Sequence, residues 1–296
     1  MINILIREFA LKQTVADRNA LEQFQKQWST YQKLVDADAV SHRAAGKFLH
    51  DALYAIPRPF AFVDIACGDA SQMREVLRGT RCHHYQGIDL SAPALQLATK
   101  NLASSPFEVE LDHEDFVEAL TKRPESADAA WCSLSIHHLP TEQKRRLFES
   151  IRRSTALFCM VYEPTLQPHE TRDEYLERFR RVNRPTWSFL TSEEWAQIDH
   201  HVTTCDLPET ASTWLTLGRE AGFANASQPF LDPTGFYGLY RYDEAQSRPG
   251  ARAATASQGN RRVTEVAKRG YLLMTDLGST VASCWPVPGH GGVAIV

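Results

Sequence analysis

Residues 62–70, which read FVDIACGDA, decide the fold of this chain. A short apolar stretch ends at the carboxylate of Asp64 and continues into a turn of small residues, and residues 71–75 open a helix behind that turn. Small residues in such a turn let a ligand lie against bare backbone, near the positive end of the helix dipole. The stretch therefore predicts a strand–turn–helix unit that binds a nucleotide-like molecule.

Composition limits what surrounds this unit. The chain has 296 residues, of which 43% are hydrophobic, enough for one large domain or for one domain with an appendage. Its longest apolar runs, such as residues 156–162, are far shorter than the roughly 20 residues of a membrane span, so no membrane partner is predicted. The N-terminus has no pattern of a secretion signal, and a cytoplasmic location is the default expectation. The six cysteines form no C-x-x-C pair, and we expect free thiols.

Charge is unevenly distributed along the chain. From residue 246 onward, six basic and two acidic side chains give a charge of +4. Because the whole chain has a net charge of −4, residues 1–245 carry a net charge of −8. An acidic main domain is a poor match for a phosphate backbone, because affinity for nucleic acid depends on basic residues. A small-molecule partner is favoured, and no nucleic-acid partner is expected.

The chain alternates between strand and helix patterns. Residues 1–56 read as a helical cap, with apolar positions at helical spacing between residues 36 and 53. Beyond the central strand, each further strand that we expect is followed by a helix, and these strands lie at residues 84–88, 107–111, 129–136 and 157–162. Five strands in alternation with helices predict an α/β fold with a doubly wound sheet, in which ligands bind beyond the carboxyl ends of the strands.

The pattern changes after the fifth strand. Residues 164–208 are predicted to form a helical lid insertion within a binding domain that spans residues 57–245. The aromatic side chains of this insertion (Trp187, Phe189 and Trp195) either line the lid or form the core of its helices. A terminal antiparallel hairpin at residues 223–230 and 235–242 would complete a seven-stranded mixed sheet. Residues 246–296 are rich in glycine and are expected to be mostly disordered.

The pattern Asp64-x-Ala66-x-Gly68-x-Ala70 resembles the first motif of the class I S-adenosylmethionine-dependent methyltransferases of the small-molecule type. Alanine stands at the two outer positions where that family has glycine. The resemblance covers about residues 30–243 and implies a Rossmann-like methyltransferase fold. It also implies S-adenosylmethionine as cofactor and transfer of its methyl group to a small-molecule acceptor by in-line displacement.

Two acidic residues after the next strands complete the expected cofactor site. Asp89 lies about 20 residues beyond Gly68, a spacing that suits hydrogen bonds from both ribose hydroxyls, although it could instead cap a helix. The resemblance implies that Asp115 accepts from the adenine amino group and that Phe116 contacts the base; the alternative is a capping aspartate beside a core phenylalanine. Asp64 is expected near the methionine end, which Tyr31 or Gln32 could close. The full expected set is Asp64, Ala66, Cys67, Gly68, Asp89, Leu90, Asp115, Phe116 and Ser133.

Candidates for acceptor chemistry follow the fourth and fifth strands. His137 and His138 have a side chain suited to removing a proton from the acceptor, and Glu163 and His169 are further candidates. The alternatives are histidines that pack or bond backbone, and a solvated loop acid at position 163. Motifs of nucleobase methyltransferases are absent after the fourth strand, which favours a small acceptor. No metal site is predicted, because His200 and His201 lack a third ligand at a recognisable spacing.

A dehydrogenase is disfavoured, because it would have a third glycine where Ser71 stands. Two other functions stay open at this stage. The same fold could instead serve as a non-catalytic S-adenosylmethionine-binding regulatory or scaffold protein, because a binding site does not establish a reaction. A protein or RNA methyltransferase that borrows its recognition surface from a partner is the other alternative.

Overall fold

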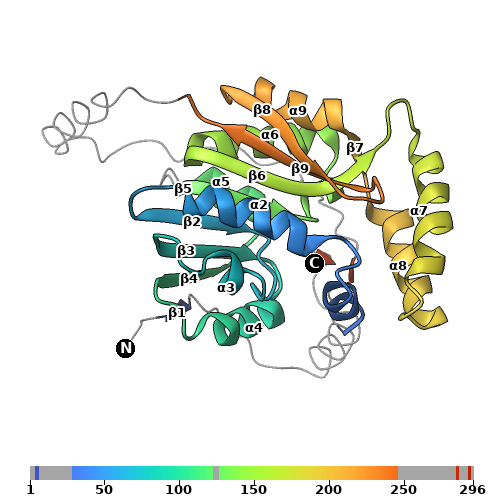
Figure 1. The fold of residues 1–296 in the computed structure, drawn as a ribbon, viewed down its shortest axis with the longest axis horizontal. Helices are drawn as coiled ribbons and strands as arrows, with labels where there is room; N and C mark the ends of the chain where they lie inside the picture. The colour runs from blue at the N-terminus through green and yellow to red at the C-terminus, as the bar shows by residue number, and fades with distance from the viewer. Residues whose placement is uncertain (1–3, 7–28, 123–126, 246–284, 287–292, 295–296) are drawn as a thin grey trace, which may run out of the picture.

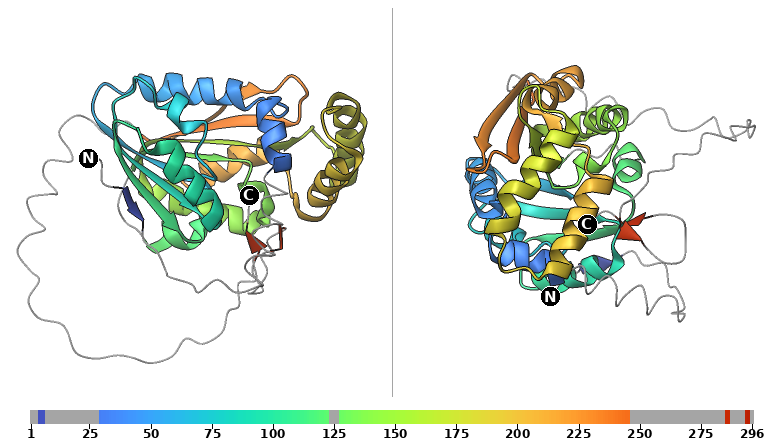
Figure 2. Two further views of the ribbon diagram at one scale, coloured as in Figure 1. Left: turned by 90° about the horizontal axis from the view of Figure 1, so that it is seen from below. Right: turned by 90° about the vertical axis from the view of Figure 1, so that its right-hand side faces the viewer.

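The computed structural model describes residues 4–6, 29–122, 127–245, 285–286 and 293–294. A central sheet carries helices on both faces, and the helices α7 and α8 stand beyond one end of it (Figures 1 and 2). The predicted hairpin and sheet are confirmed. The disorder expected for residues 246–296 concerns a segment that lies almost entirely outside the described residues. In that segment only β10 (Trp285–Pro286) and β11 (Val293–Ala294) are described, and they pair antiparallel.

The strand order explains where a ligand can bind. Neighbouring strands follow the order β1 (Ile4–Ile6), β4 (Glu108–His113), β3 (Cys82–Asp89), β2 (Phe60–Ile65), β5 (Ala127–Ser133), β6 (Thr155–Leu166), β9 (Tyr237–Asp243) and β8 (Asn225–Leu231). A short strand, β7 (Glu209–Thr210), pairs with β6 off this path. Only the pairs of β9 with β6 and with β8 are antiparallel among these strands. The strand order reverses direction at β2, so a crevice is expected at the carboxyl ends of β2, β3 and β5.

The helices cover both faces of the sheet. Their bounds are α2 (His42–Tyr54), α3 (Met73–Val76), α4 (Ala92–Leu102), α5 (Phe116–Lys122), the 3-10 helix η1 (Ile136–His138), α6 (Thr141–Ser154), α7 (Arg172–Thr186), α8 (Ser192–Cys205) and α9 (Ala211–Glu220). Residues 29–36 are also helical. The continuous helix expected from residue 36 is interrupted by a turn, where Asp38 and Ser41 have φ angles of 50° and 53°.

Adjacent side chains of β2 enter opposite halves of the core. Phe62 packs in one apolar cluster with Leu49 of α2, whereas Val63 belongs to a second cluster with Phe148 of α6. Successive side chains of a strand point to opposite faces, so a nearly continuous apolar run buries both faces of a central strand. This double burial places β2 in the centre of the sheet, between the two apolar clusters.

The inserted helices α7 and α8 have their own stabilising contacts. Each begins with a capping box, formed by Thr171 with Glu174 and by Thr191 with Glu194. Trp187 and Trp195 are buried and lie at 5.5 and 5.9 Å from the ring centre of Phe179. These two tryptophans therefore form the core of the inserted helices, as one of the two readings of the sequence expected.

Two expectations from composition can be compared with the structure. Within the described part of the chain, no helix combines the length and apolar character that a membrane span requires. Cys67, Cys82, Cys132 and Cys159 are free thiols. Cys205 is disulfide-bonded, so the expectation of free thiols was wrong for this residue. Sequence spacing alone gave no sign of this bond.

Candidate functional site

A cleft lies at the carboxyl ends of β2, β3 and β5, where the reversal of strand order opens the sheet. Its empty space is about 680 Å³, a figure that includes the open solvent at its mouth. The cleft is lined by most of the cofactor residues that the sequence proposed: Asp64, Ala66, Cys67, Gly68, Asp89 and Ser133. Leu90, Asp115 and Phe116 are not among the residues that line it.

The turn after β2 has a left-handed backbone at every second residue. The φ angles of Ala66, Gly68 and Ala70 are 56°, 54° and 51°. Glycine adopts this conformation freely, whereas an alanine there costs about 1–2 kcal/mol. The two alanines that replace the expected glycines therefore keep the glycine backbone conformation, and surrounding hydrogen bonds must hold them in it. One of these is the bond from Asn101 Nδ2 of α4 to the carbonyl of Asp69 (2.9 Å).

Asp89 connects the turn after β2 with the turn after β3. Its Oδ2 accepts the N–H of Gly68 (2.8 Å) and its Oδ1 accepts the N–H of Ser91 (2.7 Å). Ser91, rather than Asp89, caps α4 by accepting the N–H of Ala94 (3.2 Å). Because a carboxylate oxygen has two lone pairs, both oxygens of Asp89 retain capacity for a ligand hydroxyl.

Two buried carboxyl groups face this cleft with raised pKa values. Burial raises the pKa of Asp64 to about 7, although the hydroxyl of Tyr85, which donates to Asp64 Oδ2 (2.8 Å), opposes that shift. Burial also raises the pKa of Asp89 to about 6 against the hydrogen bonds from Ser91 and Gly68. A positively charged ligand would favour the ionised forms, because opposite charges attract strongly in a partly dry site. The cleft therefore suits a ligand that is both hydroxylated and cationic.

The N-terminal helices close one side of the cleft. Tyr31 and His42 line it, and Gln32 Nε2 donates to Asp69 Oδ2 (3.2 Å) across it. His42 Nε2 lies at hydrogen-bond distance from Ser133 Oγ (3.2 Å), and burial lowers the pKa of His42 to about 4. The sequence analysis missed His42. Its signal was its place one turn before Ala45, on the buried stripe of α2.

The remaining cofactor candidates have structural contacts elsewhere. Asp115 Oδ1 accepts the N–H groups of Val117 and Glu118 at the start of α5 (2.8 and 3.1 Å). Phe116 is buried in the second apolar cluster, and Leu90 accepts a hydrogen bond from His113 through its carbonyl (2.9 Å). These contacts match the alternative readings of Asp115 and Phe116, and cofactor roles for these residues stay predictions.

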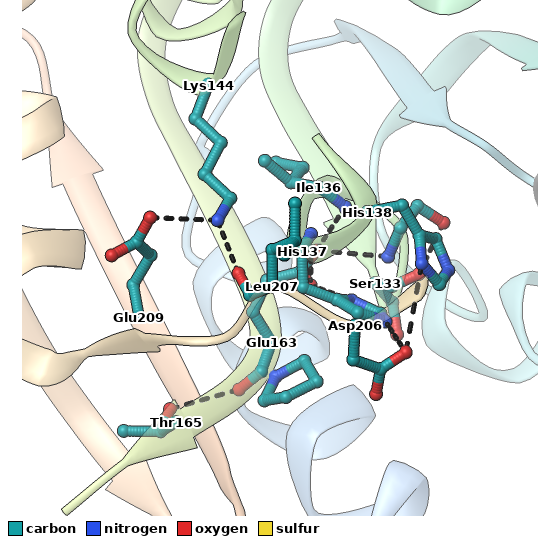
Figure 3. Close-up of polar contacts among 12 residues, drawn as sticks. Ser133, Ile136, His137, His138, Lys144, Glu163, Thr165, Asp206, Leu207 and Glu209 are labelled. Carbon is teal, nitrogen blue, oxygen red and sulfur yellow. Dashed lines mark hydrogen bonds and ion pairs between the residues drawn. The ribbon is translucent and has the colours of Figure 1, made fainter. Parts of the chain in front are cut away.

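The candidates for proton removal lie together, but they do not line the cleft. Glu163 is fully buried, and it accepts the backbone N–H groups of Ser135, Ile136 and His137 (3.2, 2.9 and 3.3 Å). Its Oε2 also lies 2.7 Å from His137 Nδ1 (Figure 3). Glu163 is thus no solvated loop acid: it holds the turn after β5. Catalytic roles for His137, His138 and Glu163 stay predictions.

This buried group includes two residues that sequence reasoning did not connect with it. Asp206 follows α8, and its Oδ1 lies 3.4 Å from His137 Nε2 and 3.8 Å from His138 Nδ1. His201, near the end of α8, approaches the same oxygen at 3.7 Å. Burial lowers the pKa of His137, but Asp206 and Glu163 outweigh it and raise that pKa to about 9. His169, in contrast, is exposed in a turn with a φ angle of 66°.

Comparisons with known proteins bear on the family and the fold. Residues 62–157 match the family described as a methyltransferase domain. No curated protein matches the chain. The structure is similar to magnesium protoporphyrin IX methyltransferase from Synechocystis PCC 6803 with bound SAH, at 11% identity and a TM-score of 0.51, over 77% of this chain and 96% of that one. It is also similar to a possible exported protein from Bordetella parapertussis, at 16% identity and a TM-score of 0.50, over 69% and 68% of the two chains. At these identities, the likenesses establish the fold.

The left-handed turn gives a prediction about stability. Replacement Ala66→Gly relieves the strained φ angle, which stabilises the folded state, but glycine also makes the unfolded chain more flexible. Because the first effect offsets the second, the free energy of unfolding should stay within about 0.5 kcal/mol of wild type or rise. Ala196→Gly, at an exposed position of α8, is the control and should cost about 1 kcal/mol. Urea denaturation compares the two. An equal loss in both variants would contradict the left-handed conformation at Ala66.

Proposed function

We propose that this chain, which carries a class I S-adenosylmethionine-dependent methyltransferase domain, transfers the cofactor's methyl group to a small-molecule acceptor by in-line displacement. The observation that carries the proposal is the pair of buried carboxyl groups, Asp64 and Asp89, that face one cleft at the ends of β2 and β3. The ligand must supply hydroxyl donors and positive charge to satisfy them. S-adenosylmethionine has both.

The donor set of the cleft fits this cofactor. Asp89 would hold the ribose hydroxyls, the backbone of residues 66–70 would support the nucleoside, and Asp64 would lie toward the cationic methionine end. Leu90, Asp115 and Phe116 would contact the base. When bound, S-adenosylmethionine supplies a methyl group on a sulfonium sulfur, which a nucleophile displaces in line.

The residues around Ser133 would orient the acceptor. Of the described residues that line the cleft, His42 alone carries an imidazole. Its lowered pKa keeps it neutral near pH 7 and makes it a weak base, so it would orient the acceptor by a hydrogen bond rather than take its proton. Glu163 would act as a positioning residue, because it fixes the N–H of Ser135, which also lines the cleft.

The charge of the main domain favours a small acceptor over a nucleic acid. Residues 1–245 carry a net charge of −8 when the +4 of the remaining chain is taken from the total of −4, which disfavours a nucleic-acid backbone. The cleft is also partly closed by the helix at residues 29–36, from which Tyr31 and Val35 line it.

Calorimetric titration with S-adenosylmethionine and S-adenosylhomocysteine tests the binding site. We expect saturable binding by the wild type and a loss of about 1–3 kcal/mol in Asp89→Ala, because ribose hydroxyls lose their acceptor. Asp112→Ala removes another buried carboxylate, on β4, that does not line the cleft, and it should bind normally. Absence of binding by the wild type would refute the proposal.

Turnover separates the enzyme from its alternatives. Formation of S-adenosylhomocysteine is measured with pools of small hydroxyl, amine and thiol compounds, and separately with protein and RNA. Turnover with a small-molecule pool supports the proposal. Turnover with protein or RNA alone would favour a macromolecular acceptor, and binding without any turnover would favour a regulatory or scaffold protein.

The raised pKa of Asp64 gives a pH dependence of known sign. The folded protein retains a proton on Asp64 up to about pH 7, whereas an unfolded chain releases it near pH 4, so this group makes the protein less stable as pH rises between these values. A cationic ligand favours the ionised form, so its affinity should increase from pH 6 to pH 8 with release of a proton.

Asp64→Asn tests this dependence, because the amide can still accept from Tyr85 and does not titrate. Its free energy of unfolding should equal that of the wild type near pH 4 and exceed it by about 1 kcal/mol or more at pH 8. Its affinity for S-adenosylmethionine should be lower and should lose most of the rise between pH 6 and pH 8. Denaturant unfolding and calorimetry at several pH values measure both. An unchanged pH profile would contradict the role of Asp64.

A further inference from the structure

Four side chains from two distant segments converge on one buried point beside the turn after β5. His137 and His138 belong to η1, whereas His201 lies near the end of α8 and Asp206 follows it. Three imidazole nitrogens face the single oxygen Oδ1 of Asp206 at 3.4, 3.8 and 3.7 Å. Figure 3 shows His137, His138 and Asp206 together, with Glu163 on the other side of His137.

His137 lies between two carboxylates, one at each ring nitrogen. Its Nδ1 lies 2.7 Å from Glu163 Oε2, a distance at which the ring donates a proton to the carboxylate. The other nitrogen of a neutral ring, Nε2, then presents a lone pair toward Oδ1 of Asp206 at 3.4 Å. Two acceptors in a buried site repel each other, so a positive species must lie between them, either a proton on Nε2 or a metal ion.

The cluster also contains polar atoms whose hydrogen-bonding capacity is unused. Within the described part of the chain, Asp206 Oδ1 and His138 Nδ1 are buried and have no hydrogen-bond partner. Both residues are more than nine-tenths buried. Leaving such groups unsatisfied costs about 1–3 kcal/mol each, and more for a charged group, so a species that satisfies several at once would stabilise the fold.

We propose that His137, His138 and Asp206, with His201 as a fourth ligand, form a site for a divalent transition-metal ion of the zinc class. One ligand atom each from the first three residues lies within 4.8 Å of the others. In a tetrahedral site with metal–ligand bonds of about 2 Å, ligand atoms are about 3.3 Å apart. The distances of 3.4, 3.8 and 3.7 Å from Asp206 Oδ1 are close to this value, and the histidines must move closer to one another where their nitrogens are further apart. Imidazole and carboxylate together suit zinc, cobalt or nickel better than calcium or magnesium.

Glu163 fits this site as the residue behind a ligand. A histidine that binds metal usually donates its other ring nitrogen to a carboxylate, which fixes the ring and raises its basicity. Glu163 makes this contact with His137. The two carboxylates, Asp206 and Glu163, also balance the charge of a divalent ion, so no net charge is left buried.

The site would fasten the inserted helices to the sheet. Its ligands join η1, which follows β5, to the end of α8 more than 60 residues later along the chain. The N–H of Leu207 already donates to the carbonyl of His137 across the same junction (2.9 Å). A metal ion here would have a structural role, because the ligands are buried and none of them lines the cofactor cleft.

Metal analysis of the full chain, purified without a histidine tag, tests this inference. We expect about one equivalent of bound zinc per chain, and an absorption spectrum of tetrahedral cobalt after exchange with Co²⁺. Removal of the metal with a chelator should lower the unfolding temperature by about 5 °C or more, and added Zn²⁺ should restore it. These readouts do not depend on methyl transfer.

Variants identify the ligands. Asp206→Asn and His201→Gln should weaken zinc affinity at least about tenfold and lose the response to chelator, whereas His200→Gln, at the exposed neighbouring position, should behave as the wild type. If Asp206→Asn does not fold, the cobalt titration of the wild type decides. A metal-free chain whose unfolding temperature does not respond to Zn²⁺, Co²⁺ or chelator would overturn the proposal and leave a protonated His137 between two carboxylates.

Discussion

The carboxylate of Asp89 is the contact on which the cleft depends. It accepts one backbone N–H from the turn after β2 and one from the turn after β3, and so holds the two turns in a fixed relation. Its burial disfavours the ionised form and raises its pKa to about 6. A ligand that supplies hydrogen-bond donors and positive charge would stabilise the ionised form of this buried carboxyl group. Asp89 therefore both holds the two turns together and offers the cleft a ligand acceptor.

Much of this arrangement could be predicted from the sequence, because it is encoded locally. The apolar run before Asp64 specified a buried strand, and small residues specified the turn that follows it. Alternation of strands and helices then predicted a doubly wound sheet, and the last two strands predicted the antiparallel hairpin. The left-handed φ angles of Ala66 and Ala70 could not be read from residue type, because alanine disfavours this conformation.

Contacts between distant segments explain what the sequence did not reveal. His42 reaches Ser133 across 91 residues, and Asp206 reaches His137 from beyond the inserted helices. No local pattern specifies such contacts. The strand β1 was also not foreseen, because only three residues form it. Conversely, the resemblance implied ligand contacts for Asp115, but an aspartate just before a helix is equally typical of a helix cap, which is the contact that the structure gives it.

The turn after β5 connects the two polar centres of the molecule. Ser133 and Ser135 line the cleft, and three residues further along His138 belongs to the proposed metal site. Glu163 holds this turn from beneath through backbone N–H groups. Contacts that stabilise the inserted helices therefore also support one wall of the cleft, although the two centres are lined by different residues.

Hydrogen–deuterium exchange with and without S-adenosylhomocysteine tests the central claim most directly. If the cofactor binds in the cleft, peptides that cover residues 64–72 and 89–91 will be protected by the ligand, and peptides from α8 will exchange at unchanged rates. Backbone amides in these turns would become shielded from water or more strongly hydrogen-bonded. Saturating ligand without protection of residues 64–72 would contradict the account.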